Sequence, residues 1–186
     1  MTLIVALKDK NGKAYIGNDW ITTAGWEIIS ASADKTIQIW WWIIWIAGIA
    51  RLKDIIKNMP ASSYPKKIST HKDVSTFAKK VVWAVTLYDI EFGIPEDSQK
   101  FKGTEMCIIW KKNIFEVYWH WDVVERKYTA IWSWQSYAIW ILKYLELQWL
   151  LDNLSAKDVQ QIIYNTITAV SHILPEIGWD ISVKNL

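Results

Sequence analysis

The sequence lacks the residue patterns that mark several specialised classes of protein. Cysteine occurs once, as Cys107 within the apolar residues 106–110, so a disulfide framework is excluded and we expect a buried, apolar role for this side chain. Charge is nearly balanced, with 21 basic and 19 acidic residues, which gives no electrostatic footprint for nucleic acid or an anionic membrane. The longest apolar run, residues 39–50, is too short to span a bilayer, and the first residues do not resemble a signal peptide. We therefore expect a soluble, cytoplasmic protein that binds neither nucleic acid nor membrane.

Glycine is also scarce. The chain has 7 glycines in 186 residues, whereas average usage is about 7%. Tryptophan, in contrast, occurs 15 times. Glycine normally supplies positive φ angles and close backbone approach, and tryptophan is a poor replacement for either.

The first candidate functional residue is Thr2, the second residue of the sequence. A small residue after the initiator methionine allows aminopeptidases to remove Met1, which would leave Thr2 at the N-terminus. An N-terminal threonine carries a hydroxyl nucleophile and a free α-amine, and the ordinary pKa of that amine, roughly 7.7–8.0, suits a general base near neutral pH. One residue can therefore hold both reactive groups.

The apolar patterns predict strands and helices in separate groups. The pair Asn11-Gly12 predicts a hairpin between the first two strands, and Ser155 with Asp158 predicts a capping box at the start of the last helix. Strands are predicted at residues 3–7, 14–19, 20–23, 26–30, 35–40, 43–47, 104–110, 114–118, 122–128, 129–132 and 181–183, and helices at 48–58, 73–88, 135–151 and 155–173. This order argues against a parallel βαβ sheet and for a layered α+β fold in a single domain, residues 1–186.

Four features of the first part of the chain resemble the proteasome β-subunit family, including its bacterial HslV type. They are Thr2 at the start of a strand, Asp19 at the end of the next, Lys35 at the start of another, and the turn Ala47-Gly48. The resemblance implies a four-layer αββα sandwich and an N-terminal-nucleophile hydrolase. The segregated order of the predicted elements agrees with that architecture.

The resemblance also implies roles for individual residues. Thr2 would be the nucleophile and Lys35 the buried lysine beside it, whose ammonium lowers the pKa of the amine and favours the attacking alkoxide. Asp19 would keep Lys35 charged and oriented, because a buried lysine otherwise tends to lose its proton. The N–H of Gly48 would face the oxyanion. Ser133, in the segment that resembles the family's Ala-Ile-Gly-Ser-Gly, would hydrogen-bond near the threonine amine. Without an N-terminal threonine, a surface salt bridge would be the simpler reading of Asp19 and Lys35.

The resemblance also implies a substrate pocket, and at two other positions the sequence departs from the family. Thr22, Ala33 and Ile46 match positions that line the pocket for the substrate side chain, and they would make it mostly apolar. Leu174 and Ile177 stand where many members have an aspartate and a serine that support the nucleophile.

A second departure concerns the tryptophans. Five of them stand where the family has glycine: Trp45, Trp132, Trp134, Trp140 and Trp179. Three explanations are open: an engineered chain, a natural outlier, or a molecule whose residues differ from the printed sequence at these positions.

The resemblance therefore predicts a threonine-type peptidase in a self-compartmentalising ring of identical subunits. It would act on polypeptides, would need no metal or organic cofactor, and could work with an ATP-dependent unfoldase. Two alternatives are a non-catalytic assembly protein of the same architecture and an N-terminal-nucleophile amidase that acts on a small molecule. A metal site at His120 and Asp122 is a weak alternative, because two ligands at this spacing are common without metal.

Overall fold

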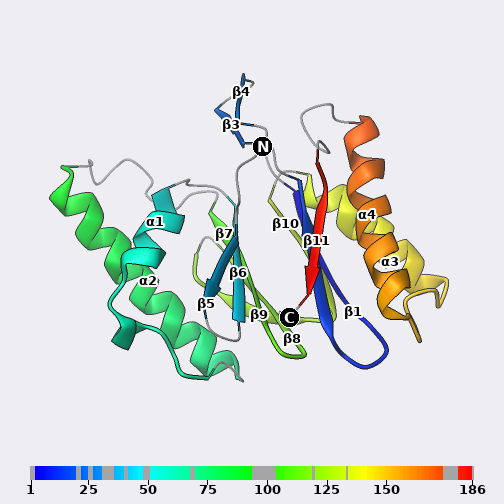
Figure 1. The fold of residues 1–186 in the computed structure, drawn as a ribbon, viewed down its shortest axis with the longest axis horizontal. Coiled ribbons are helices and arrows are strands. Elements are labelled where there is room, and N and C mark those ends of the chain that lie inside the picture. The colour runs from blue at the N-terminus through cyan, green and yellow to red at the C-terminus, as the bar shows by residue number, and fades with distance from the viewer. Residues whose placement is uncertain are drawn as a thin grey trace.

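The computed structural model describes residues 3–19, 22–24, 27–30, 36–39, 42–47, 51–67, 70–93, 104–118, 120–132, 134–173 and 180–185. Two antiparallel sheets lie face to face, and a pair of helices covers the outer face of each sheet (Figure 1). This arrangement is the predicted α+β fold with four layers, αββα. Within the described ranges, no helix is both long enough and apolar enough to cross a membrane.

The first sheet is built around the N-terminal hairpin. Its strand order is β10 (Tyr128–Trp132), β1 (Leu3–Lys8), β2 (Ala14–Asn18) and β11 (Ser182–Asn185). Gly12 in the β1–β2 turn has a φ of 77°, and Oδ1 of Asp9 accepts hydrogen bonds from the backbone N–H groups of Asn11 and Lys13, each at 2.8 Å. The predicted hairpin is confirmed, and an aspartate side chain holds its turn closed.

The second sheet contains five strands, and a separate short hairpin lies beyond one end of the sheets (Figure 1). The order in the sheet is β5 (Thr36–Ile39), β6 (Trp42–Ala47), β7 (Glu105–Trp110), β8 (Asn113–Val117) and β9 (Val123–Arg126). The separate hairpin pairs β3 (Thr22–Ala24) with β4 (Glu27–Ser30). After β9 the chain crosses to the first sheet as β10.

Two of the helices begin at side-chain capping boxes. The second sheet carries α1 (Arg51–Asn58) and α2 (His71–Glu91), joined through the 3-10 turn η1 (Ala61–Ser63), and the first sheet carries α3 (Gln135–Leu147) and α4 (Ala156–Ile173). Ser155 and Asp158 form the predicted capping box, with hydrogen bonds of 2.9 and 3.3 Å. Thr70 and Asp73 form a second one, so α2 starts earlier than predicted.

One helix is shorter than predicted. The apolar periodicity continues to residue 151, but α3 ends at Leu147 because the backbone turns left-handed at Trp149, where φ is 60°. Side-chain periodicity does not report such a change of backbone direction, so the prediction was wrong by one turn.

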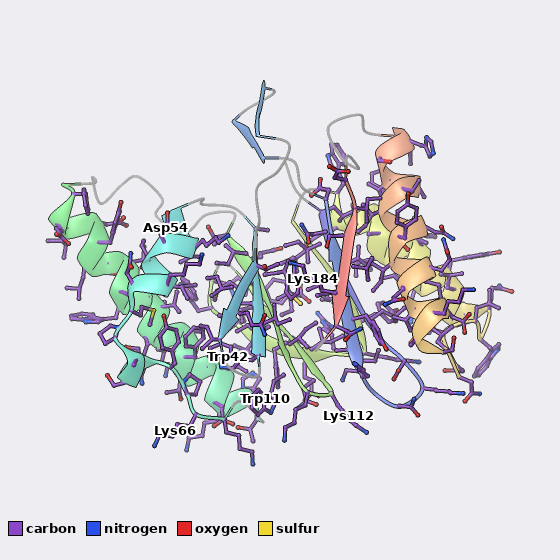
Figure 2. The ribbon with its side chains drawn as sticks, in the orientation of Figure 1. Trp42, Asp54, Lys66, Trp110, Lys112 and Lys184 are labelled. Atoms are coloured by element: carbon purple, nitrogen blue, oxygen red, sulfur yellow. The ribbon has the colours of Figure 1, made fainter. Side chains whose placement is uncertain are left out.

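Three apolar layers hold the sheets and helices together. In β1, Leu3, Val5 and Leu7 face α3 and α4, whereas Ile4 and Ala6 face the second sheet. The period of two in a strand places successive side chains in different layers, and both are buried because the sheet is covered on both faces. On the other side, Trp42 and Trp110 lie opposite each other in β6 and β7, in the layer between the second sheet and α2 (Figure 2).

Candidate active site

The structure describes three of the eight predicted site residues. These are Asp19, Thr22 and Ile46. The others, Thr2, Ala33, Lys35, Gly48 and Ser133, lie outside the described residues, as do Leu174 and Ile177. The site is therefore built from the residues that flank these positions.

Asp19 joins the end of β2 to the start of β1. The side chain is fully buried, and its Oδ1 accepts a hydrogen bond from the backbone N–H of Leu3 at 3.2 Å. The backbone N–H of Asp19 in turn donates to the carbonyl oxygen of Leu3 at 3.3 Å. Asp19 thus holds the backbone of the residue that directly follows Thr2.

Next to Asp19, a buried hydrogen-bond chain connects the two sheets. The indole Nε1 of Trp45 in β6 donates to Oδ1 of Asn18 at 3.1 Å, and Nδ2 of Asn18 donates to the carbonyl oxygen of Asp19 at 2.7 Å. Asn18 is only 2% exposed. These two hydrogen bonds tie this end of β6 to the end of β2.

The strand register brings further positions to the same end of the sandwich. Leu3 lies opposite Trp132 in the β1–β10 pair, and Thr36 lies opposite Trp45 in the β5–β6 pair. The last residue of β6, Ala47, follows two residues after Trp45. In Figure 1 this is the upper end of both sheets, the end beyond which β3 and β4 lie.

The two predicted pocket residues in the described ranges occupy different elements. Ile46 is 6% exposed and belongs to the apolar layer between the second sheet and the helices α1 and α2. Thr22 opens β3, paired with Ser30 of β4. A role for either in substrate binding stays a prediction.

A second polar cluster, which the sequence did not indicate, lies where β9 crosses to β10. Oε2 of the buried Glu116 accepts hydrogen bonds from Nε of Arg126 at 3.1 Å and from Oγ1 of Thr129 at 2.9 Å, and Nη2 of Arg126 donates to the hydroxyl of Tyr118 at 2.8 Å. The bond to Tyr118 raises the pKa of the Arg126 guanidinium, and burial raises the pKa of the Tyr118 hydroxyl. The four residues line a cavity of about 560 Å³. The Glu116 carboxylate and the Arg126 guanidinium neutralise each other and are held by hydrogen bonds, so we assign the cluster a structural role.

The histidine with a carboxylate neighbour forms a surface pair. Nδ1 of His120 lies 3.2 Å from Oδ2 of Asp122, and both side chains are exposed. Across the described ranges, no group of three or more histidine, cysteine, aspartate or glutamate side chains is placed to hold a metal ion.

Comparison with solved structures identifies the architecture. BPH from Thiobacillus denitrificans in complex with epoxomicin matches with a TM-score of 0.71 and 21% identity, over 100% of this chain and 98% of that one. Eukaryotic HslV from Trypanosoma brucei matches with a TM-score of 0.66 and 14% identity, over 100% of this chain and 99% of that one. A Gly-1 mutant of Anbu from Hyphomicrobium sp. strain MC1 matches with a TM-score of 0.75 and 14% identity, over 100% of this chain and 81% of that one. The chain therefore has the HslV-type, proteasome-like fold that its sequence resembles. The sequence itself matches no protein-family model and no curated protein.

Proposed function

We propose that the protein is a threonine-type peptidase whose nucleophile is Thr2, exposed by removal of Met1. The observation that carries the proposal is the meeting of strand ends around Asp19. The residues next in the chain to these ends are the predicted ones. Thr2 precedes Leu3, Ser133 follows Trp132, Lys35 precedes Thr36 and Gly48 follows Ala47.

In the proposed reaction, Oγ of Thr2 attacks the scissile carbonyl carbon and its proton passes to the α-amine of the same residue. The N–H of Gly48 stabilises the oxyanion. The protonated amine then gives its proton to the leaving amine, which leaves an ester between Thr2 and the acyl part of the substrate. Water, deprotonated by the α-amine, hydrolyses that ester and regenerates the enzyme.

Asp19 would have two separable roles in this reaction. Its hydrogen bond to the N–H of Leu3 orients the residue before it, and its negative charge would hold Lys35 as an ammonium. An asparagine at this position keeps an oxygen acceptor for the N–H of Leu3, and its amide group replaces the charged carboxylate.

We further propose that the protein acts as an oligomer of identical subunits. Large apolar side chains remain exposed on the outer helices, including Leu87 and Ile90 on α2 and Tyr144 and Leu147 on α3. Apolar surface of this kind is common where subunits meet.

The first test compares Thr2 variants for hydrolysis of fluorogenic peptides. We expect Thr2→Ala to abolish turnover while native mass spectrometry still detects the same oligomer, and Thr2→Ser to keep measurable activity because it retains a hydroxyl and an amine.

Lys35→Ala should lower the rate of peptide hydrolysis nearly as much as Thr2→Ala, since the two residues act as a unit. Asp19→Asn should lower kcat by roughly 100-fold or more and shift its pH profile, because it removes charge but not the hydrogen bond.

Two outcomes would contradict the proposal. Turnover by Thr2→Ala would exclude the proposed nucleophile. An intact mass that retains Met1, together with no retention of epoxomicin (the ligand of the similar BPH structure) by the wild-type oligomer, would favour the non-catalytic assembly protein.

A further inference from the structure

Tryptophan occupies backbone conformations that normally require glycine. Among the described residues, six that are not glycine have a positive φ, and three of the six are tryptophan: Trp121 at 70°, Trp134 at 63° and Trp149 at 60°. Two of the others are Asn153 and Asp180, residue types whose short polar side chains tolerate this region. For a bulky side chain such as tryptophan the same conformation is an outlier.

The clearest case is Trp149, which ends α3 in a Schellman motif. The N–H of Leu150 donates to the carbonyl oxygen of Leu145, and the N–H of Trp149 donates to that of Glu146, both at 2.9 Å. In this motif the residue at the position of Trp149 is left-handed and is usually glycine. The tryptophan side chain adds nothing to the motif, because it is 79% exposed.

Trp121 occupies a second glycine position, in the turn between β8 and β9. The N–H of Trp121 donates to the carbonyl oxygen of Tyr118 at 2.8 Å, and the N–H of Tyr118 donates to that of Asp122 at 2.9 Å. These bonds close a three-residue hairpin loop whose last residue is left-handed, the position that glycine prefers in such loops. Trp121 differs from Trp149 in that its half-buried ring packs against the apolar layer of the second sheet.

The third case, Trp134, precedes the first residue of α3. Its side chain makes no capping hydrogen bond, and its ring lies 5.9 Å from that of Tyr137 with both rings partly exposed. Neither capping nor burial of this side chain accounts for a left-handed tryptophan here.

From these three turns we infer that positions 121, 134 and 149 are glycine in the native protein. The composition agrees, because the surplus of tryptophan accompanies a shortage of glycine in the same chain. Trp42 and Trp45 show that the inference is position-specific. They lie in strand β6 and are buried, so their conformation does not by itself require glycine.

If the proposed peptidase function also holds, the inference bears on its site. Position 134 directly follows Ser133 in the sequence, so a glycine there would give the predicted serine a neighbour without a side chain. The glycine assignment itself does not depend on catalysis, and its test needs no activity.

The deciding experiment is peptide mapping by mass spectrometry of the protein purified from the cells that express it naturally. We expect the peptides that contain residues 121, 134 and 149 to carry glycine, each lighter by one tryptophan-to-glycine difference. Tryptophan in those peptides would overturn the inference. The same peptide map identifies the residue at each of the other tryptophan positions.

A second experiment tests the physical reason on the chain with the printed sequence. Trp149→Gly should raise the ratio of folded to unfolded protein by a factor of about 5 to 30 over Trp149→Ala, because only glycine avoids the cost of a left-handed β-carbon. The matched control is Trp83, which is 65% exposed inside α2, where glycine should instead be worse than alanine by a factor of about 5. Equal stability of the glycine and alanine variants at position 149 would contradict the argument from backbone conformation.

Discussion

At Asp19, one buried carboxylate hydrogen-bonds to the backbone at the start of strand β1. Its Oδ1 accepts a hydrogen bond from the N–H of Leu3. Oδ1 of the neighbouring Asn18 accepts one from the indole N–H of Trp45 in the opposite sheet. A resemblance in sequence could assign Asp19 a charge-pairing role with Lys35. The bond to Leu3 is a second role, which only the pairing of β1 with β2 makes possible.

Also at the residue scale, Cys107 should be chemically inert in the folded protein. It is fully buried in the layer between the two sheets, as predicted for a lone apolar cysteine, and burial raises the pKa of its thiol well above the ordinary value. Reaction with a thiol reagent such as 5,5′-dithiobis(2-nitrobenzoate) should be absent in the native protein and complete after denaturation. Fast labelling of the native protein would show that the layer opens.

The raised pKa of the Cys107 thiol makes the stability of the fold depend on pH. The folded thiol has the higher pKa, so its contribution to the free energy of unfolding is fully present below the ordinary thiol pKa and decreases as the pH rises above it.

At the scale of elements, the contact between α4 and β2 depends on a glycine. A β-carbon on Gly17 would lie 2.4 Å from Cγ2 of Ile163 in α4 and 3.2 Å from the carbonyl oxygen of Ser182 in β11. Strand β2 is central in its sheet, with β1 on one side and β11 on the other, so the backbone cannot move away easily.

We therefore expect Gly17→Ala to lower the free energy of unfolding by about 1–3 kcal/mol, through overpacking. Ile163→Ala removes the clashing methyl group and by itself should lower the free energy of unfolding by about 2–5 kcal/mol. Urea unfolding of the two single variants and the double variant should give less than the sum of the two costs. Strict additivity would mean that Ile163 is not what limits the space at Gly17.

At the scale of the whole molecule, the Glu116 cluster joins the two sheets. Glu116 in β8 and Arg126 in β9 belong to the second sheet, and Thr129 in β10 belongs to the first. The side chain of Glu116 is 5% exposed, whereas that of Arg126 is 42% exposed. The carboxylate is therefore the member of the pair that cannot return to water if its partner is removed.

Arg126→Ala should lower the free energy of unfolding by about 1–3 kcal/mol, because it leaves the Glu116 carboxylate buried with one fewer hydrogen bond. This is below the cost of breaking a fully buried pair, since water can reach the arginine side. The neighbouring Lys127 supplies the control. Its pair with Asp152, at 3.2 Å, is exposed on both sides, so Lys127→Ala should change stability by no more than about 0.5 kcal/mol. Equal effects in thermal unfolding would show that burial does not distinguish the two pairs.

The sequence by itself determined the kind and order of the elements, because apolar periodicity, the Asn11-Gly12 turn and the Ser155 capping box act over a few residues and have the same physical cause in any fold. The layered α+β architecture followed from that order. The tertiary structure decided what depends on distant parts of the chain: the register that sets Leu3 opposite Trp132, the bond from Trp45 to Asn18, and the close packing at Gly17. It also decided where α3 ends, since the left-handed turn at Trp149 is a backbone property that side-chain periodicity does not encode.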